Sequence, residues 1–223
     1  MEQLTRISRE SSSLRQRTTE ALRTAILEGV FAPGQKLSER ELCERLDVSR
    51  PCIRESLQHL QAEGLVTIVL HRGPEVSKMD DNEVRDLYAV RVSLETLVVR
   101  GFVGHATAAQ KTALRTCVDR LAAQVRDGGS SELLSIKGEF YDILIDGCGN
   151  SVVGQLLRQL NNRVTVLRRT SMARPGRLPQ TVKELDALVR AIEEGQEDKA
   201  AELCCEHLRN ACANALNGVP LAH

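Results

Sequence analysis

The stretch "LDVSRPCIRESLQHLQAEGL", residues 46–65, has the pattern of a short helix with two arginines one turn apart near its start. Ser49 can cap this helix, Pro51 lies in the first turn, where no backbone N–H is needed, and Gly64 ends it. Apolar residues recur at helical spacing on a different face, namely Ile53, Leu57 and Leu60. The stretch therefore predicts an amphipathic helix that buries one face and presents its arginines on another.

The preceding segments predict two further helices. The first covers residues 14–28 and is ended by a glycine and a turn. The second starts within "LSERELCERL", residues 37–46, where Ser38 and Glu41 have the S-x-x-E spacing of a capping box. Only a short turn separates this second helix from the arginine-bearing one. Two helices joined so tightly predict a helix-turn-helix.

The run "LVTIVLHRGPEVSK", residues 65–78, predicts two short strands around a turn, which is a wing. In a helix-turn-helix the second helix places its first residues against base edges, and arginine pairs with guanine or clamps phosphate. The formal net charge of the chain is zero, so DNA binding must come from local placement of charge. The residues that we expect to contact DNA are Arg40, Ser49, Arg50, Arg54, His71, Arg72 and Gly73. The alternative is that the arginines are solvated surface charges paired with Glu39, Glu44 or Glu55.

The composition favours a helical body. Of the 223 residues 42% are hydrophobic but only 2% are aromatic, so the core must be aliphatic, which suits helix packing better than a sheet sandwich. No apolar run approaches the roughly 20 residues of a membrane span and the N-terminus lacks the pattern of a signal peptide, so we expect a cytoplasmic protein. Seven cysteines without a CxxC pair are expected to be small buried hydrophobes rather than disulfides or metal ligands.

Residues 34–76 resemble the winged helix of GntR-family transcription regulators, and "DLYAVRVSLE", residues 86–95, resembles the opening of the all-helical FCD effector domain of the FadR-like branch. The resemblance implies a mainly α protein, with a winged helix-turn-helix over residues 1–78 and an effector-binding and dimerisation bundle over residues 79–223. It also implies a homodimer that binds a pseudopalindromic operator and releases it or rearranges on it when a small metabolite enters the C-terminal bundle. We expect a repressor, although the sequence itself does not distinguish a repressor from an activator. Pro51 departs from the pattern, because a side chain that contacts DNA can occur at that position.

Helical patterns continue through the second domain without an intervening strand pattern, which predicts a bundle. The expected helices cover residues 80–104, 108–127, 131–147, 150–172, 179–194 and 197–216. The apolar faces that we expect to be buried are Leu87, Val90, Leu94 and Val98 in the first helix, Leu133, Ile136, Phe140 and Leu144 in the third, and Val153, Leu156, Leu160, Val164 and Leu167 in the fourth.

Polar side chains interrupt these apolar faces. Arg91 projects from the middle of the first, Lys137 lies inside the third with Tyr141 at its edge, Arg163 and Arg168 flank the fourth, and His207 lies among small residues of the last helix. Buried unpaired cations cost several kcal/mol, so several of them must share an anion. A structural pair between Arg91 and Glu95 is the alternative. We expect a cavity for a small anionic metabolite, a carboxylate, lined by Arg91, Lys137, Tyr141, Arg163, Leu185 and His207.

The resemblance also raises the question of a metal. Many FCD domains hold a divalent cation with an aspartate and a histidine four residues apart on one helix and a histidine on each of two later helices. These positions correspond here to Lys137, Tyr141, Leu185 and His207. A single histidine beside an ammonium group cannot hold zinc or nickel, so no metal or other cofactor is expected. A regulator that still binds metal through His207 is the alternative.

Two other classes of function deserve comparison. Lysine, tyrosine and histidine converging on a pocket are also components of acid–base enzymes, but the chain has no nucleophile elbow, phosphate-binding loop or dinucleotide fingerprint. A DNA-binding protein that ignores metabolites would keep the winged helix but would have no reason to line a bundle with cations. The sequence therefore favours a ligand-responsive regulator with double-stranded DNA, a small anion and a second copy of itself as partners, and without a membrane.

Overall fold

The protein is described by a computed structural model that covers residues 9–128, 132–172 and 174–216. It consists of two compact units, which divide between Lys78 and Met79. The described ranges hold nine helices and one two-stranded sheet, so the fold is mainly α, with a winged helix-turn-helix followed by a helical bundle. Within these ranges, none of the helices has the length and apolar character needed to cross a membrane.

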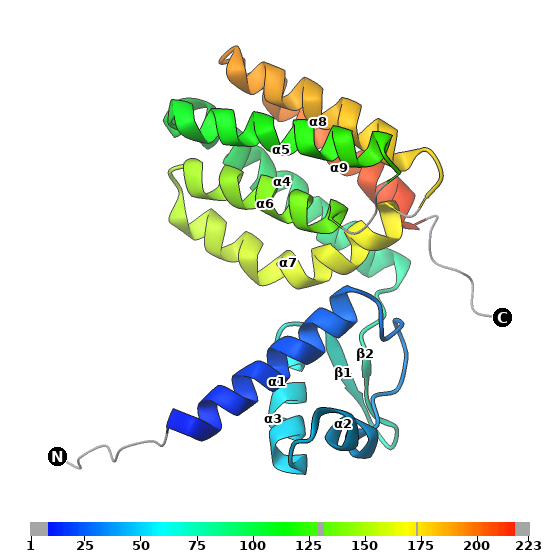
Figure 1. The fold of residues 1–223 in the computed structure, drawn as a ribbon. Coiled ribbons are helices and arrows are strands. Elements are labelled where there is room, and N and C mark those ends of the chain that lie inside the picture. Colours follow the sequence, from blue (N-terminus) through cyan, green and yellow to red (C-terminus); the bar gives the residue numbers. More distant parts are fainter. Residues whose placement is uncertain (1–8, 129–131, 173, 217–223) are drawn as a thin grey trace. The chain divides into compact units, whose positions relative to one another are not determined.

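The N-terminal unit is a winged helix-turn-helix (Figure 1). Its elements are α1 (Arg9–Leu27), α2 (Glu39–Leu46), α3 (Arg50–Ala62), β1 (Val66–Val69) and β2 (Gly73–Val76). Helix α3 packs against both α1 and α2 and leads directly into the hairpin. The apolar face predicted for this helix is confirmed, because its three members are almost completely buried, namely Ile53, Leu57 and Leu60.

The wing is anchored on both sides of β2. Strand β1 pairs with it in antiparallel register, with Val66 opposite Val76 and Val69 opposite Gly73. On the other side, Lys36 forms an isolated antiparallel β-bridge with Glu75, so that the segment before α2 also pairs with β2. These pairings join the wing to the helix-turn-helix through backbone hydrogen bonds.

The caps of the two helices of the motif differ from the predicted ones. The Ser38 hydroxyl accepts from the backbone N–H of Glu41 at 3.4 Å, but the return bond of a capping box is absent from the described contacts, so only half of the predicted box forms. Ser49 occupies the N-cap of α3 with extended backbone angles, yet its side chain makes no capping hydrogen bond to the described residues. The hydroxyl of Ser49 is exposed and remains available to an external acceptor.

The C-terminal unit is a bundle whose helices end within two residues of the predicted limits (Figure 1). Two of its N-termini, at Asp80 and Thr107, carry complete capping boxes. The helices are α4 (Asp81–His105), α5 (Ala108–Arg126), α6 (Leu133–Gly147), α7 (Ser151–Met172), α8 (Arg177–Glu193) and α9 (Glu197–Leu216).

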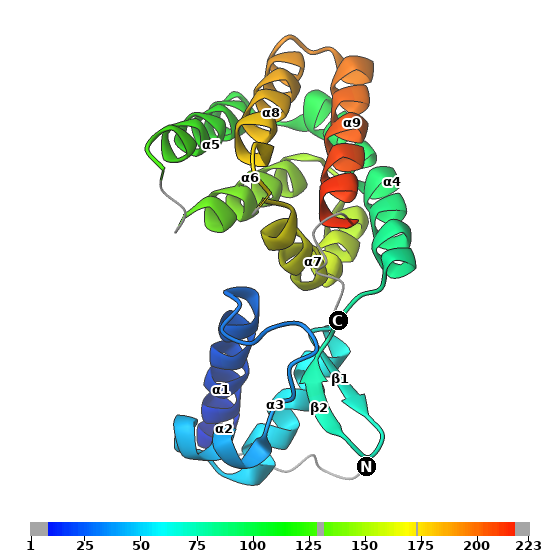
Figure 2. The same ribbon diagram turned by 90° about the vertical axis from the view of Figure 1, so that its right-hand side faces the viewer.

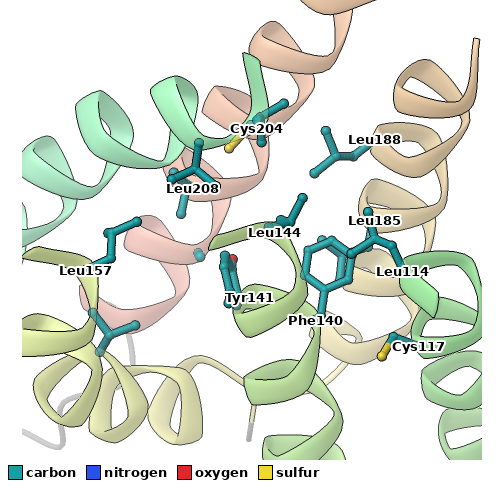
Figure 3. Packing of buried hydrophobic residues seen from close by; sticks show 14 of the residues in the cluster. Leu114, Cys117, Phe140, Tyr141, Leu144, Leu157, Leu185, Leu188, Cys204 and Leu208 are labelled. Atoms are coloured by element: carbon teal, nitrogen blue, oxygen red, sulfur yellow. The ribbon is translucent and has the colours of Figure 1, made fainter. Parts of the chain in front are cut away.

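The core of the bundle is aliphatic, as the composition predicts. Helices α4 and α9 lie side by side, and α6 contacts α4, α5 and α7 (Figure 2). Figure 3 shows side chains from α5, α6, α7, α8 and α9 converging around Phe140 and Tyr141, whose rings meet edge to face. Large aromatic anchors are few, so the interior is filled mainly by leucine, isoleucine and valine.

Two residues assigned to buried faces are in fact exposed. Val90 on α4 is 48% exposed and Leu156 on α7 is 43% exposed, while Leu94 and Leu160 are half-buried. On α4 the buried face is rotated toward Tyr88, Arg91 and Glu95, so that polar side chains occupy its centre. On α7 Leu157, rather than its neighbour, packs inward. The predicted faces are otherwise confirmed.

The cysteines are only partly as expected. All seven are free thiols, and Cys117, Cys148 and Cys204 are buried. The others are half-buried, namely Cys43, Cys52, Cys205 and Cys212. Burial raises the pKa of the Cys204 thiol well above its ordinary value, with smaller contributions from the Glu95 carboxylate and Cys205. Cys204 therefore behaves as a buried hydrophobe.

Candidate DNA-binding surface and effector cavity

The start of α3 presents two arginines to solvent. Arg50 is exposed, and Arg54, one turn later, is 65% exposed at its side chain. The Nε of Arg54 donates to the carboxylate of Glu39 at 2.8 Å, which orients the guanidinium and leaves its two terminal nitrogens for another partner. An exposed ion pair of this kind contributes little stability and can accept a ligand on its free side. The pair is therefore compatible both with a contact to DNA and with a solvated surface charge.

The other residues of the expected DNA-contacting set also lie on the surface of the N-terminal unit. Arg40 is largely exposed, and its contact with Glu44 on the same helix is long, 3.5 Å. At the wing tip His71 and Arg72 are exposed. His71 has a φ of 63° and Gly73 a φ of 86°, so that the chain turns back sharply at Arg72, which lies between them.

Five helices of the second unit surround a small cavity of about 10 Å³. We call it the effector cavity. The polar side chains that line it are far more numerous than in an ordinary core, and the two apolar ones are Met172 and Ala211. The polar lining consists of Tyr88 and Arg91 from α4, Lys137 from α6, Arg168 and Ser171 from α7, Arg177 and Thr181 from α8, and His207 from α9.

Arg91 is only 1% exposed and forms an internal ion pair. Its Nε donates to Glu95, one turn later on α4, at 2.7 Å, and its guanidinium lies 4.6 Å from the centre of the Tyr88 ring. Burial disfavours the charged form, but the carboxylate of Glu95 outweighs it and raises the pKa of Arg91 above its ordinary value. Arg91 is therefore a fixed cation. The structural pair with Glu95 forms, yet Nη1 of Arg91 has no hydrogen-bond partner in the described chain.

A second carboxylate, Glu184 on α8, organises the opposite side of the cavity. It accepts from Nη1 of Arg177 at 2.8 Å, from the amide of Asn210 at 2.7 Å and from Nδ1 of His207 at 2.6 Å. Burial raises the pKa of Glu184, but the hydrogen bonds from His207 and Arg177 outweigh it and lower the pKa to about 2. Glu184 is therefore ionised and fixes the tautomer of the histidine ring.

Lys137 lies beside the other ring nitrogen of His207. Its Nζ is 3.5 Å from Nε2 of His207, and the lysine is 3% exposed. Burial and the neighbouring guanidinium groups of Arg168, Arg91 and Arg177 lower the pKa of Lys137 well below its ordinary value. Among the residues that the structure describes, the hydrogen-bond partner of its ammonium group is the His207 ring.

Arg168 is the second cation of the cavity without a carboxylate in the part of the chain that is described. Its guanidinium lies 4.1 Å from the centre of the Tyr141 ring, a cation–π contact. Burial lowers the pKa of Arg168, because the tyrosine ring replaces the solvation of the charge only in part. Nε of Arg168 has no hydrogen-bond partner there.

The expected lining of the cavity needs two corrections and one adjustment. Arg163 does not line it: this side chain is about a third exposed and faces Glu83 at 3.9 Å, because α7 turns its other flank, with Arg168, inward. Leu185 is buried in the aliphatic core rather than in the cavity wall. Tyr141 borders the cavity through Arg168, and its own ring lines the neighbouring apolar space.

Sequence reasoning missed several polar side chains that line the cavity or bind its lining residues. Glu184 was not predicted, although it follows Thr181 by three residues and precedes Leu188 by four on α8, which places it beside a buried stripe. Tyr88, Arg177 and Thr181 were also missed. Arg177 lies in the first turn of a helix that begins two residues earlier than predicted, so periodicity gave no signal for it.

The positions that hold metal in related domains do not fit a divalent cation here. Lys137 directs an ammonium group at His207, and Leu185 offers no donor atom. No group of three or more histidine, cysteine, aspartate or glutamate side chains suited to a metal ion occurs within residues 9–128, 132–172 and 174–216. A divalent cation needs three or four deprotonated donors, so the donor chemistry of this site suits an anion instead.

Comparisons with known proteins agree with the two-unit architecture. Residues 14–76 match the gntR family of bacterial regulatory proteins, and residues 86–210 match the FCD domain. The HTH-type transcriptional regulator YdhC of Bacillus subtilis (strain 168) is 22% identical over 192 residues, which is 86% of each chain. The HTH-type transcriptional repressor GlaR of Escherichia coli (strain K12) is 27% identical over 198 residues, covering 84% of this chain and 89% of GlaR.

A solved structure has the same fold. A GntR-type transcriptional regulator from Rhodococcus sp. RHA1 superposes with a TM-score of 0.79 at 24% identity, covering 93% of this chain and all of the other. The winged helix and the helical bundle are thus the two domains of a bacterial transcription regulator. The chain belongs to the GntR family, in the branch that carries an FCD domain, as the resemblance predicted.

Proposed function

We propose that this protein is a transcription repressor that binds a pseudopalindromic operator as a homodimer and releases it when a small carboxylate metabolite enters the effector cavity. The observation that carries the proposal is the buried cavity, in which four cationic side chains face one another but only two carboxylates compensate them. A structural core would not retain such charges unless an external anion completed the site. Relatives named as repressors support the direction of regulation.

The DNA-binding half of the proposal rests on the surface of the N-terminal unit. Arg50 and Arg54 at the start of α3 would face base edges, and Arg40 would reach the flanking phosphates. The tip of the wing would enter a neighbouring groove. The proposed contacts are Arg40, Ser49, Arg50, Arg54, His71, Arg72 and Gly73, all of them on α2, α3 or the wing. Because its target is chromosomal DNA, the protein would act in the cytoplasm.

A stripe on α4 supports the homodimer. Val90 and Leu97 are 48% and 54% exposed, and Leu94 lies between them, so the three share one face at helical spacing. Exposed apolar side chains that line up in this way are typical of an interface. A Leu97→Glu variant should shift the mass measured by light scattering from dimer to monomer. An unchanged dimer would place the interface on another surface.

The experiment that tests the effector half is a thermal-shift screen with small carboxylic acids, followed by operator release in a gel-shift assay. A ligand that binds the native state raises the melting temperature by mass action. We expect at least one acid both to raise the melting temperature and to release operator DNA. A set of acids that does neither would favour a DNA-binding protein that ignores metabolites.

A further inference from the structure

The effector cavity contains more cationic charge than the protein itself neutralises. Arg91 is paired with Glu95, and Arg177 is paired with Glu184. The remaining two cations, Lys137 and Arg168, contact the His207 ring and the Tyr141 ring and form no ion pair among the residues whose positions are described. Four basic side chains and two carboxylates leave a formal excess of two positive charges when every group is ionised.

The unpaired hydrogen-bond donors of the cavity independently indicate a ligand with more acceptor oxygens than a single carboxylate has. Five buried N or O atoms that line it have no partner in the described ranges, and the ammonium of Lys137 has only the long contact with His207. One carboxylate offers about four lone-pair sites, fewer than these six groups require. The five atoms are Oη of Tyr88, Nη1 of Arg91, Nε of Arg168, Nη2 of Arg177 and Oγ1 of Thr181.

We propose that the effector is a compact dianion with at least four acceptor oxygens, of which a short dicarboxylate is the best example. This inference rests on the proposed function and specifies its ligand. The donors come from α4, α6, α7 and α8, on several sides of the space, which favours charge at two ends of the ligand over charge at a single point. The cavity itself measures about 10 Å³, roughly the room that one water molecule needs, so its lining side chains must move apart to admit the ligand and only a compact ligand fits.

Series of matched acids test the charge of the ligand. Malonate, succinate and glutarate would each be compared with the corresponding monoamide and diamide, which keep the shape but carry one charge or none, and inorganic phosphate would be added as a tetrahedral dianion. Binding would be measured at neutral pH by calorimetry and thermal shift on the full-length protein. We expect a dianion to bind, and its monoamide to bind about tenfold more weakly or worse.

Variants of the two uncompensated cations connect this preference to the cavity. Lys137→Met and Arg168→Gln should each reduce the preference for the dianion over its monoamide from about tenfold to less than about threefold. Lys183→Gln is the matched control, because this lysine is exposed on the outer face of α8 and should keep the full preference. A full preference retained in both cavity variants would overturn the inference.

Thermal stability of the ligand-free protein gives a readout that requires no ligand. An uncompensated buried cation destabilises the fold, so Lys137→Met should leave the melting temperature unchanged or raise it. A fall of more than about 4 °C would show that Lys137 is already compensated and would contradict the charge count.

The outcomes separate this inference from the function on which it rests. If a monoanion binds as tightly as the dianion and releases operator DNA, the inference fails and the proposed function stands. If no acid of any charge binds, both fail. If phosphate binds and the dicarboxylates do not, the dianion is retained and its charge lies on one tetrahedral group.

Discussion

The ammonium nitrogen of Lys137 lies 3.5 Å from Nε2 of His207, while Nδ1 of the same ring lies 2.6 Å from a carboxylate oxygen of Glu184. Burial and the proximity of Lys137 lower the pKa of His207 to about 3, so the ring is neutral at physiological pH. A neutral imidazole has a single N–H, and its donation to Glu184 leaves the lone pair of Nε2 toward the lysine. The three residues therefore form a chain that requires a neutral histidine.

This chain predicts a loss of stability in mild acid. His207 binds a proton near pH 6.5 in the unfolded chain but only near pH 3 in the folded protein, so the unfolded state holds more protons between these values. The free energy of unfolding should be full above about pH 6.5 and fall as the pH drops toward 3. His207→Gln should flatten this dependence in urea unfolding measured from pH 4.5 to 7.5. His59→Gln, an exposed histidine on α3, is the control, and equal slopes in the two variants would contradict the assignment.

Ligand binding should be accompanied by proton uptake at Lys137. Burial and the cations nearby lower the pKa of the free lysine, and a bound anion would raise it again. The affinity for an anionic effector should therefore fall as the pH rises through the pKa of the free lysine. Calorimetry in HEPES and in Tris, which differ in ionisation enthalpy, should give different binding enthalpies, and Lys137→Met should remove the difference. The charged groups that influence this lysine are Arg91, Arg168, Arg177 and Glu95.

Glu95 should be essential for stability even in the absence of ligand. Glu95→Gln leaves the guanidinium of Arg91 buried without its carboxylate, and breaking such a pair costs about 3–5 kcal/mol. Glu139→Gln is the matched control, because its pair with Arg120 is exposed and screened by solvent, so the variant should unfold much like the wild type. Urea unfolding measures both. Equal losses in the two variants would show that burial of the Arg91 pair has no special cost.

The fold could be predicted from the sequence because local signals agreed at every level. The capping residues, glycines and aliphatic spacing set the limits of the bundle helices to within two residues, whereas α1 begins five residues before its predicted start. The cavity was less accessible. Arg163 and Arg168 lie on opposite flanks of α7, about 140° apart at 100° per residue, and only packing decides which flank turns inward. Glu184 was missed because one carboxylate beside a buried stripe has the same pattern as a solvated charge.

Arg50→Ala and Arg54→Ala should each abolish specific operator binding without unfolding the protein. Both side chains are exposed, so the fold does not depend on them. Each substitution removes contacts worth about 1–3 kcal/mol per half-site, and a symmetric dimer loses them at both half-sites. Glu39→Gln should have a smaller effect in the same direction, because it frees the Arg54 guanidinium that Glu39 holds. Fluorescence anisotropy at physiological salt measures the affinity, with Arg126→Ala in the other unit as control. Wild-type affinity in either arginine variant would show that α3 does not read the operator.

Response to the effector should be separable from DNA binding. Lys137→Ala and Arg168→Gln change the effector cavity, whereas the proposed DNA contacts belong to the other compact unit. We expect both variants to bind operator DNA about as tightly as the wild type without ligand, and to retain it at acid concentrations that release the wild type. Arg91→Ala is a poorer test, since it would leave Glu95 unpaired in the core and destabilise the bundle. If both cavity variants released the operator at wild-type concentrations of acid, these cations would be structural and the effector would bind elsewhere.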